Sequence, residues 1–149
     1  EDWADTTMAS LCKKALIKSA LDNPKLRSAL VPEDIPSSVK SIFDNFPFKN
    51  LNKISNLVLS NKSNIEFQKI LESLSKAVIN KRFLIGDNLT IADISIASQL
   101  SLLKFPTSSG PNLCGEGCQE FINNPYLENL FQWRDNLEEY IFSASSQDI

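Results

Sequence analysis

Cysteine has the most reactive side chain in this sequence. The segment Cys114-Gly-Glu-Gly-Cys118 places two cysteines four residues apart, and Cys12 lies far upstream. A structural zinc site needs four ligands, and no second pair of ligands is evident, so we predict no metal site. An odd number of cysteines leaves at least one free thiol, and the set suits a reducing cytosol. We therefore interpret Cys114 and Cys118 as ordinary thiols, with a reversible, redox-sensing disulfide between them as the alternative.

The sequence contains no histidine. Histidine is the commonest general base, the commonest metal ligand and the side chain that titrates near physiological pH. Its absence excludes Ser-His-Asp and Cys-His catalysis within this chain. We predict no catalytic residue here.

Thr90 and Asp93 form the most distinctive polar pair, but their spacing favours a structural role. Gly86 and the pair Asp87-Asn88 favour a turn, and Thr90-Ile91-Ala92-Asp93 has the spacing of a capping box. In a capping box the threonine and the acid each satisfy a free backbone N–H at the start of a helix. We therefore predict that a helix begins at Thr90.

The residues after Thr90 predict a buried central helix. Leu89 and Ile94 are spaced as a hydrophobic staple, which fixes the angle at which the chain enters the helix. Two apolar lines follow on the helix, and together they leave little polar surface. The first comprises Ile91, Ile94, Ala97 and Leu102, and the second comprises Ile96, Leu100 and Leu103.

Composition predicts a single all-α domain spanning residues 1–149. The chain is 42% hydrophobic and 22% charged, with four glycines, and it is long enough to bury one sizeable core. The net charge of −3 and the scattered lysines and arginines argue against a nucleic-acid partner. No apolar stretch approaches the length of a membrane span, so we expect no membrane partner and a cytoplasmic location. The chain begins at Glu1 without a methionine, which suggests a cut or processed end.

Periodicity and caps predict further helices around the central one. The first covers Glu1 to Leu21, and Asn23-Pro24 ends it. Shorter helices are expected from Ser37 or Ser38 to Phe46, from Asn50 to Leu59, from a second capping box at Ser63 to Ile79, over Gln119 to Ile122, and from Asn124-Pro125 to about Phe142. Ser60-Asn61-Lys62 is interpreted as a break, and Phe105 to Gly117, rich in Pro and Gly, as an exposed loop.

The order of these features resembles the C-terminal all-helical domain of glutathione S-transferases. Phe83-Leu84-Ile85-Gly86 with Leu89-Thr90-Ile91-Ala92-Asp93 is similar to the segment that opens that family's central buried helix. Glu1-Asp2-Trp3-Ala4-Asp5 resembles the acidic, tryptophan-bearing start of the domain's first long helix. Asn124-Pro125-Tyr126-Leu127 with Trp133 resembles the pattern of a late helix. The resemblance covers essentially the whole chain, and its specific part is the segment around Thr90.

The resemblance implies a division of labour between two domains. In that family a thioredoxin-like domain precedes the helical one, binds glutathione as co-substrate and carries the activating Ser, Tyr or Cys. That domain is absent from this chain, so the chain alone is expected to be inactive and to hold no cofactor. The helical half is expected to pack against this N-terminal domain, to provide the hydrophobic wall of the electrophile pocket, and to supply a homodimer surface.

By position, this resemblance makes Trp3, Met8, Leu11 and Phe105 the candidates for the pocket wall. Asp5 is the candidate for contacting the ammonium group of glutathione. Each has a plainer explanation, because the apolar residues suit a core and an acid in the first helical turn is favoured by the helix dipole. Residues 22–61 are longer and richer in proline than the family pattern. A second hypothesis is a non-catalytic interaction module of the same fold, as in translation-factor and tRNA-synthetase appendages.

Overall fold

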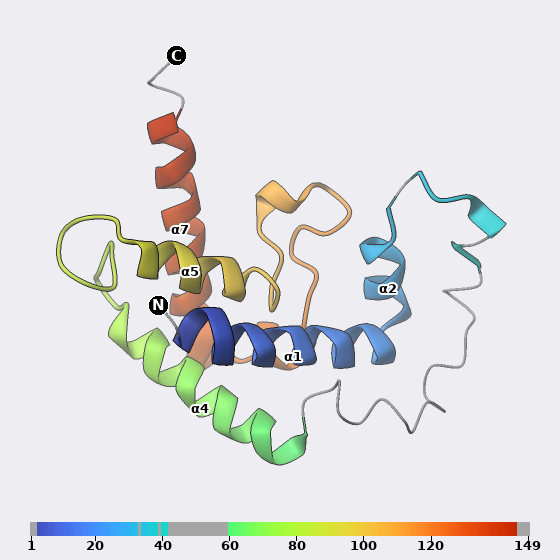
Figure 1. The fold of residues 1–149 in the computed structure, drawn as a ribbon, viewed down its shortest axis with the longest axis horizontal. Helices are drawn as coiled ribbons and strands as arrows, with labels where there is room; N and C mark the ends of the chain where they lie inside the picture. The colour runs from blue at the N-terminus through green and yellow to red at the C-terminus, as the bar shows by residue number, and fades with distance from the viewer. Residues whose placement is uncertain (1–2, 33, 39, 42–59, 146–149) are drawn as a thin grey trace.

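The computed structural model describes residues 3–32, 34–38, 40–41 and 60–145, without the side chains of residues 4 and 5. Within these ranges the fold is all-α, with six α-helices and no named strand. Figure 1 shows α1 (Ala9–Asp22) crossing the middle of the molecule, with α4 (Asn61–Ala77) and α5 (Ile91–Leu100) near its N-terminal end. Helix α7 (Glu128–Ser145) runs crosswise to α5, and its C-terminal end projects from the body.

The first predicted helix is divided at its start. A π-helical turn, η1 (Ala4–Met8), precedes α1, and η1 packs against α5. Met8, Cys12 and Ala15, at spacings of four and three, are fully buried, so they form the inner line of this element. Asn23 ends α1 and also caps α2 (Pro24–Leu30), because its side chain accepts hydrogen bonds from two backbone N–H groups of the next helix. The predicted proline boundary at Asn23-Pro24 is confirmed.

Helix α4 begins earlier than the sequence suggested. Ser60 is its N-cap, and the Ser60 Oγ accepts a hydrogen bond from the backbone N–H of Ser63 at 3.2 Å. The predicted break over 60–62 and the predicted start at Ser63 are therefore wrong, because the capping serine lies three residues upstream. The inner line of α4 and its C-cap residue runs through Phe67, Leu71 and Val78, all of which are buried.

Helix α5 is only partly the buried helix that was predicted. Asp93, Ile96 and Leu100 are buried, whereas Ile91 and Ile94 are 59% and 42% exposed. The capping box turns Asp93 inward, so the residues three and seven positions later follow it into the core. Ile91 and Ile94 lie on the opposite side of the helix, which contradicts the predicted inner line through them.

The segment after α5 is held closed at its base. The backbone N–H of Phe105 donates to the Glu116 carbonyl at 2.8 Å, and the N–H of Cys118 donates to the Leu103 carbonyl at 2.8 Å. Gly117 pairs with Lys104 in an isolated antiparallel bridge. The segment predicted as an exposed loop is thus closed at its base by backbone hydrogen bonds, and it contains a short 3₁₀ turn, η4 (Thr107–Ser109).

The C-terminal part follows its predicted signals closely. The predicted single turn over Gln119–Ile122 is helix α6. Asn124 caps the 3₁₀ turn η5 (Pro125–Leu127), which leads into α7. Helix α7 continues to Ser145, three residues beyond the predicted end, and its buried residues are Leu130, Phe131, Trp133, Arg134 and Leu137.

One hydrophobic core joins these elements. It contains Phe67 from α4, Leu100 from α5, Phe121 from α6 and Leu130 from α7, all fully buried. The rings of Phe67 and Phe121 meet edge to face with centroids 5.6 Å apart. The described helices include none with the length and apolar character needed to cross a membrane. The predicted helix over 50–59, and most of the one ending at Phe46, lie outside the described residues.

Candidate functional site

Trp3 lines an apolar hollow at the N-terminal edge of the molecule. The hollow has a volume of about 380 Å³ and is formed between Trp3 and the α4 residues Lys69, Ile70, Ser73 and Leu74. Trp3 is 40% exposed, so part of its ring faces solvent. Ile70 and Leu74 are half-buried because they lie at the edge of the inward face of α4. An apolar ligand or a chain segment packed here would lose contact with water while burying little polar protein surface, which is favourable.

The other predicted pocket residues do not share this position. Met8 is fully buried in the core, and Leu11 is half-buried and packs against that core. Phe105 is half-buried at the closed base of the 105–117 segment, where its backbone carbonyl accepts a hydrogen bond from the Gly115 N–H at 2.9 Å. The Asp5 side chain lies outside the described part of the chain. Of the five predicted contact residues, Trp3 is the one that lines a described hollow.

Thr90 and Asp93 form the capping box of α5. Asp93 is fully buried, and its Oδ2 accepts hydrogen bonds from the Thr90 backbone N–H at 2.8 Å and from the Thr90 hydroxyl at 2.6 Å. Its Oδ1 accepts a third hydrogen bond, from the Leu84 backbone N–H at 2.6 Å. The carboxylate therefore joins the preceding turn to the helix start. Because all three hydrogen bonds of the Asp93 carboxylate are made to groups of this chain, Asp93 has a structural role.

The three cysteines are free and occupy different environments. Cys12 and Cys118 are fully buried, whereas Cys114 is exposed. Burial raises the pKa of the Cys118 thiol to about 11, and burial also raises the pKa of Cys12. Both buried thiols are therefore protonated at neutral pH and are poor nucleophiles. Among the described residues, no group of three or more His, Cys, Asp or Glu side chains is placed to hold a metal ion.

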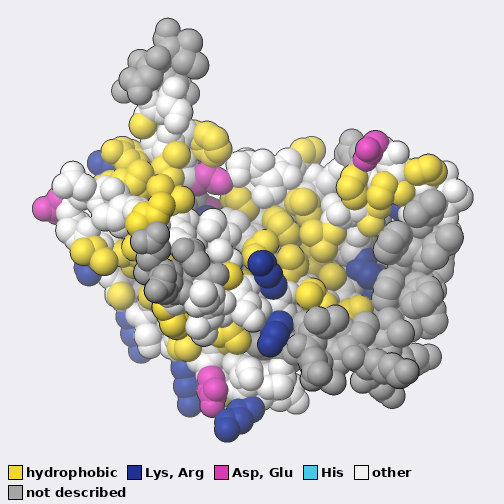
Figure 2. All heavy atoms as spheres, viewed as in Figure 1, with side chains coloured by type: hydrophobic (Ala, Val, Ile, Leu, Met, Phe, Trp, Pro, Cys, Tyr) yellow, Lys and Arg dark blue, Asp and Glu magenta, His cyan; other side chains and the backbone are white. Residues whose placement is uncertain are grey.

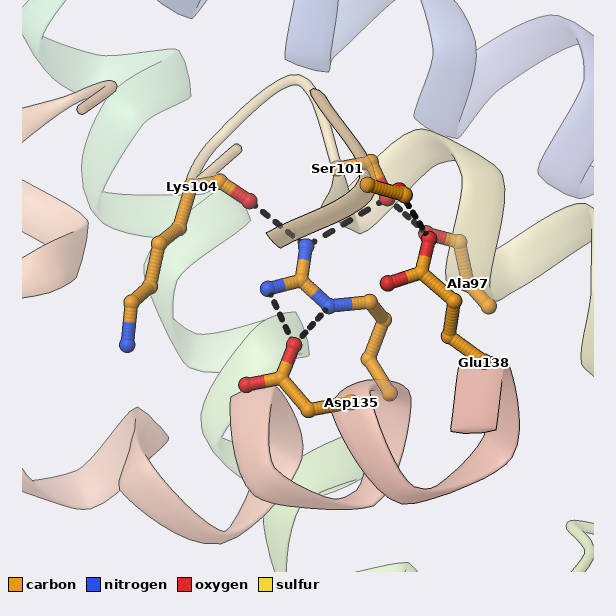
Figure 3. Close-up of polar contacts among 7 residues, drawn as sticks. Ala97, Ser101, Lys104, Asp135 and Glu138 are labelled. Atoms are coloured by element: carbon orange, nitrogen blue, oxygen red, sulfur yellow. Dashed lines mark hydrogen bonds and ion pairs between the residues drawn. The ribbon is translucent and has the colours of Figure 1, made fainter. Parts of the chain in front are cut away.

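A buried arginine that the sequence did not predict lies at the junction of α5 and α7. Figure 3 labels Lys104 and Ser101, two of its acceptor residues. Arg134 is 1% exposed, and its Nη1 donates to the Lys104 carbonyl at 2.5 Å and to the Ser101 Oγ at 3.3 Å. Its Nε donates to Asp135 at 2.7 Å. Arg134 follows the buried Trp133 in a helix with a conventional apolar pattern, and arginine is rarely buried unless paired. No local signal in the sequence shows that it is internal.

Beside Arg134 lies a second hollow between α5 and α7. It has a volume of about 200 Å³, and the residues that line it include Ile94, Ala97, Leu137, Ile141 and Phe142. Phe142 is 58% exposed. Figure 2 shows apolar side chains gathered over this end of the molecule, and others beside α1. Among the described residues, apolar side chains are therefore exposed at Trp3 and at Ile94 on α5.

Comparison of the chain with protein-family models, with curated proteins and with solved structures gave no match.

Proposed function

We propose that this chain is the helical domain of a glutathione S-transferase-like protein. In the complete protein, a thioredoxin-like domain would bind glutathione and supply its activated thiolate. The helical domain would provide the apolar surface against which an electrophile lies while the thiolate attacks it. No residue of the chain takes part in the chemistry under this proposal.

The observation that carries the proposal is the arrangement around Asp93. The resemblance rests mainly on residues 83–93, and these residues fold as one unit with the buried carboxylate bonded to both Leu84 and Thr90. The all-α architecture supports the same reading. Trp3 adds a functional element, since its half-exposed ring and the hollow beside α4 offer an apolar wall at the start of the first helix.

The test is glutathione conjugation by the full-length protein with an apolar aryl halide as electrophile. The nucleophile is the glutathione thiolate, and thioether formation releases halide. Trp3→Ala should raise KM for the electrophile several-fold and leave KM for glutathione unchanged, because only the apolar wall is shortened. Ile65→Ala is the matched control, since Ile65 is exposed on α4 and is not among the residues lining the hollow.

Two results would overturn the proposal. One is a folded full-length protein with no conjugating activity. The other is an upstream coding region without a βαβ start, without a Ser, Tyr or Cys near its first helix, and without a proline before its third strand.

A non-catalytic interaction module of the same fold is the second candidate. The exposed Ile91 and Ile94 on α5 favour it, because a protein partner would bury these two apolar side chains. This candidate predicts that charged substitutions such as Ile94→Asp abolish partner binding without changing glutathione turnover. A homodimer through the same surface would appear as a concentration-dependent mass in sedimentation equilibrium, and Ile94→Asp would shift that mass to the monomer.

A further inference from the structure

The hollow beside Trp3 has an apolar inner side and a polar outer edge. Ile70 and Leu74, four positions apart on α4, are half-buried and line its inner side. Lys69 and Ser73, each one position earlier, are exposed and line its outer edge. Residues four apart lie on one line of a helix, so the hollow runs alongside α4 with apolar side chains toward the core and polar ones toward solvent.

Trp3 gives this hollow an aromatic wall with a free surface. Trp3 is 40% exposed, whereas the other tryptophan, Trp133, is 4% exposed and donates its indole N–H to the Arg82 carbonyl at 3.0 Å. Aromatic rings pack against one another in offset or edge-to-face contacts, which gain free energy beyond the burial of their area. The volume of about 380 Å³ is within the range of small-molecule sites. A planar aromatic ring therefore suits the space against Trp3.

Lys69 is the charged residue among the described residues that line the hollow. It is exposed, and it makes no ion pair with any described residue. The Ser73 hydroxyl beside it donates its hydrogen to the Lys69 backbone carbonyl at 2.9 Å, so this hydrogen is not free for a ligand. The Lys69 ammonium group is therefore the side-chain donor that these lining residues offer to a ligand.

The acids next to Lys69 leave its charge unpaired. Glu66 and Glu72 lie three positions to either side of it on α4, and neither lines the hollow. The Glu72 Oε1 accepts a hydrogen bond from the Asn124 Nδ2 at 3.3 Å instead. A lysine ammonium group has three N–H donors and no acceptor, so it selects a ligand group that accepts hydrogen bonds, and an anion most strongly.

We propose that the hollow beside Trp3 binds planar aromatic compounds that carry a carboxylate or a similar anionic group. The aromatic ring lies between Trp3 and the inner side formed by Ile70 and Leu74, and the anionic group points toward solvent at Lys69. Because the anionic group stays hydrated at the rim, binding buries no unpaired charge. The inference rests on the proposed function, since it takes the same hollow as the wall of the electrophile pocket, and it narrows the electrophiles to anionic aromatic compounds.

An NMR titration of residues 1–149 with sodium 2-naphthoate tests this inference. The two indole N–H signals, assigned with Trp3→Phe, report on the hollow and on the core separately. We expect a saturable shift of the Trp3 signal and of the backbone amides of residues 69–74, with no shift of the Trp133 signal. The neutral 2-naphthylmethanol should bind about two- to fivefold more weakly than naphthoate, and the cationic 2-naphthylmethylammonium more weakly still.

Substitution of Lys69 separates the charge from the apolar wall. Lys69→Met keeps an unbranched apolar side chain, so it should weaken naphthoate binding about two- to fivefold and leave naphthylmethanol binding unchanged. Lys62→Met is the matched control, because Lys62 is an exposed lysine seven positions earlier on α4 and is not among the residues lining the hollow. It should change neither affinity. Trp3→Ala should weaken both ligands about tenfold, because the ring loses its aromatic wall.

Several results would overturn the proposal. Equal affinities for naphthoate and naphthylmethanol, or equal losses from Lys69→Met and Lys62→Met, would contradict the role of Lys69. Equal shifts of the Trp3 and Trp133 signals, or no saturable shift, would contradict the binding site itself. If Lys69→Met fails to fold by circular dichroism, ionic strength decides: added salt should weaken naphthoate binding and leave naphthylmethanol binding unchanged, and equal effects on both would contradict the role of Lys69.

The titration is independent of the conjugation assay, because it contains neither glutathione nor an upstream domain. Absence of naphthoate binding in a full-length protein that conjugates neutral aryl halides overturns the ligand class and leaves the transferase proposal standing. Naphthoate binding with no conjugating activity supports the site beside Trp3 and overturns the transferase proposal.

Discussion

Replacing Asp93 by alanine should destabilise the fold more than the loss of an ordinary helix cap. The change removes a fully buried acceptor and leaves the backbone N–H groups of Leu84 and Thr90 without their partner. Each buried donor left unpaired costs about 1–3 kcal/mol, whereas the Thr90 hydroxyl can rotate to another acceptor. Removing a buried charge returns part of this cost. The sum is a loss of about 3–4 kcal/mol, against roughly 0.5–2 kcal/mol for a typical N-cap substitution.

Urea unfolding followed by far-ultraviolet circular dichroism measures this loss. Asp87→Ala is the matched control, because Asp87 is an exposed acid in the turn just before the helix. It should change the free energy of unfolding by less than about 0.5 kcal/mol. Asp93→Asn should fall between the two, since it keeps one acceptor oxygen. If Asp93→Ala costs no more than Asp87→Ala, the interpretation of Asp93 as the link between the turn and α5 is wrong.

Four further predictions concern the backbone, the thiols and the buried arginine. Gly117→Ala should lower the free energy of unfolding in urea by several kcal/mol, because the added Cβ would lie 2.2 Å from the Leu103 carbonyl oxygen. The control Gly115→Ala places its Cβ within 4 Å of no atom, so it should cost only the roughly 1–2 kcal/mol of a left-handed backbone. Equal losses in the two variants would contradict the predicted clash at Gly117. In the native protein one thiol, Cys114, should react promptly with a disulfide reagent, and Cys114→Ser should abolish this reaction; two prompt thiols in the wild type would contradict the burial of Cys118. Burial raises the pKa of the Cys118 thiol from 9.0 to about 11, so this thiol stays protonated to a higher pH in the folded state than in the unfolded state. The contribution of the Cys118 thiol to stability is therefore complete below pH 9 and is lost as the pH rises toward 11. Urea unfolding measured at a series of pH values checks this loss. Arg134→Met should cost about 2–3 kcal/mol by the same assay, since the Lys104 carbonyl loses its charged donor; a loss below 1 kcal/mol would show that the network is dispensable.

Local signals in the sequence were sufficient for most helix boundaries. Thr90 with Asp93, and Asn23 and Asn124 before their prolines, are caps that act over three or four residues, so the sequence alone identifies them. The prediction of a break at Ser60 was wrong because serine and asparagine favour both breaks and helix caps, and only the helix that follows decides between the two. The closed base of the 105–117 segment depends on backbone pairing between Lys104 and Gly117, which composition does not encode.

The candidate sites were harder to predict because they depend on which helices meet. The two apolar lines of α5 look alike in sequence, and the inward turn of Asp93 selects Ile96 and Leu100 for the core over Ile91 and Ile94. The hollow lined by Lys18 of α1 and Glu120 of α6 joins residues about one hundred positions apart, and single-sequence periodicity carries no information about such pairs. The burial of Arg134 likewise follows from its partners on the α5 side, not from its neighbours in α7.

Retention of the full-length protein on immobilised glutathione tests the transferase proposal most directly. Residues 1–149 should pass through the column, because under this proposal the glutathione site belongs to the upstream domain. The full-length protein should be retained and should elute with free glutathione. A full-length protein that is folded by circular dichroism and passes through the column would contradict the proposal.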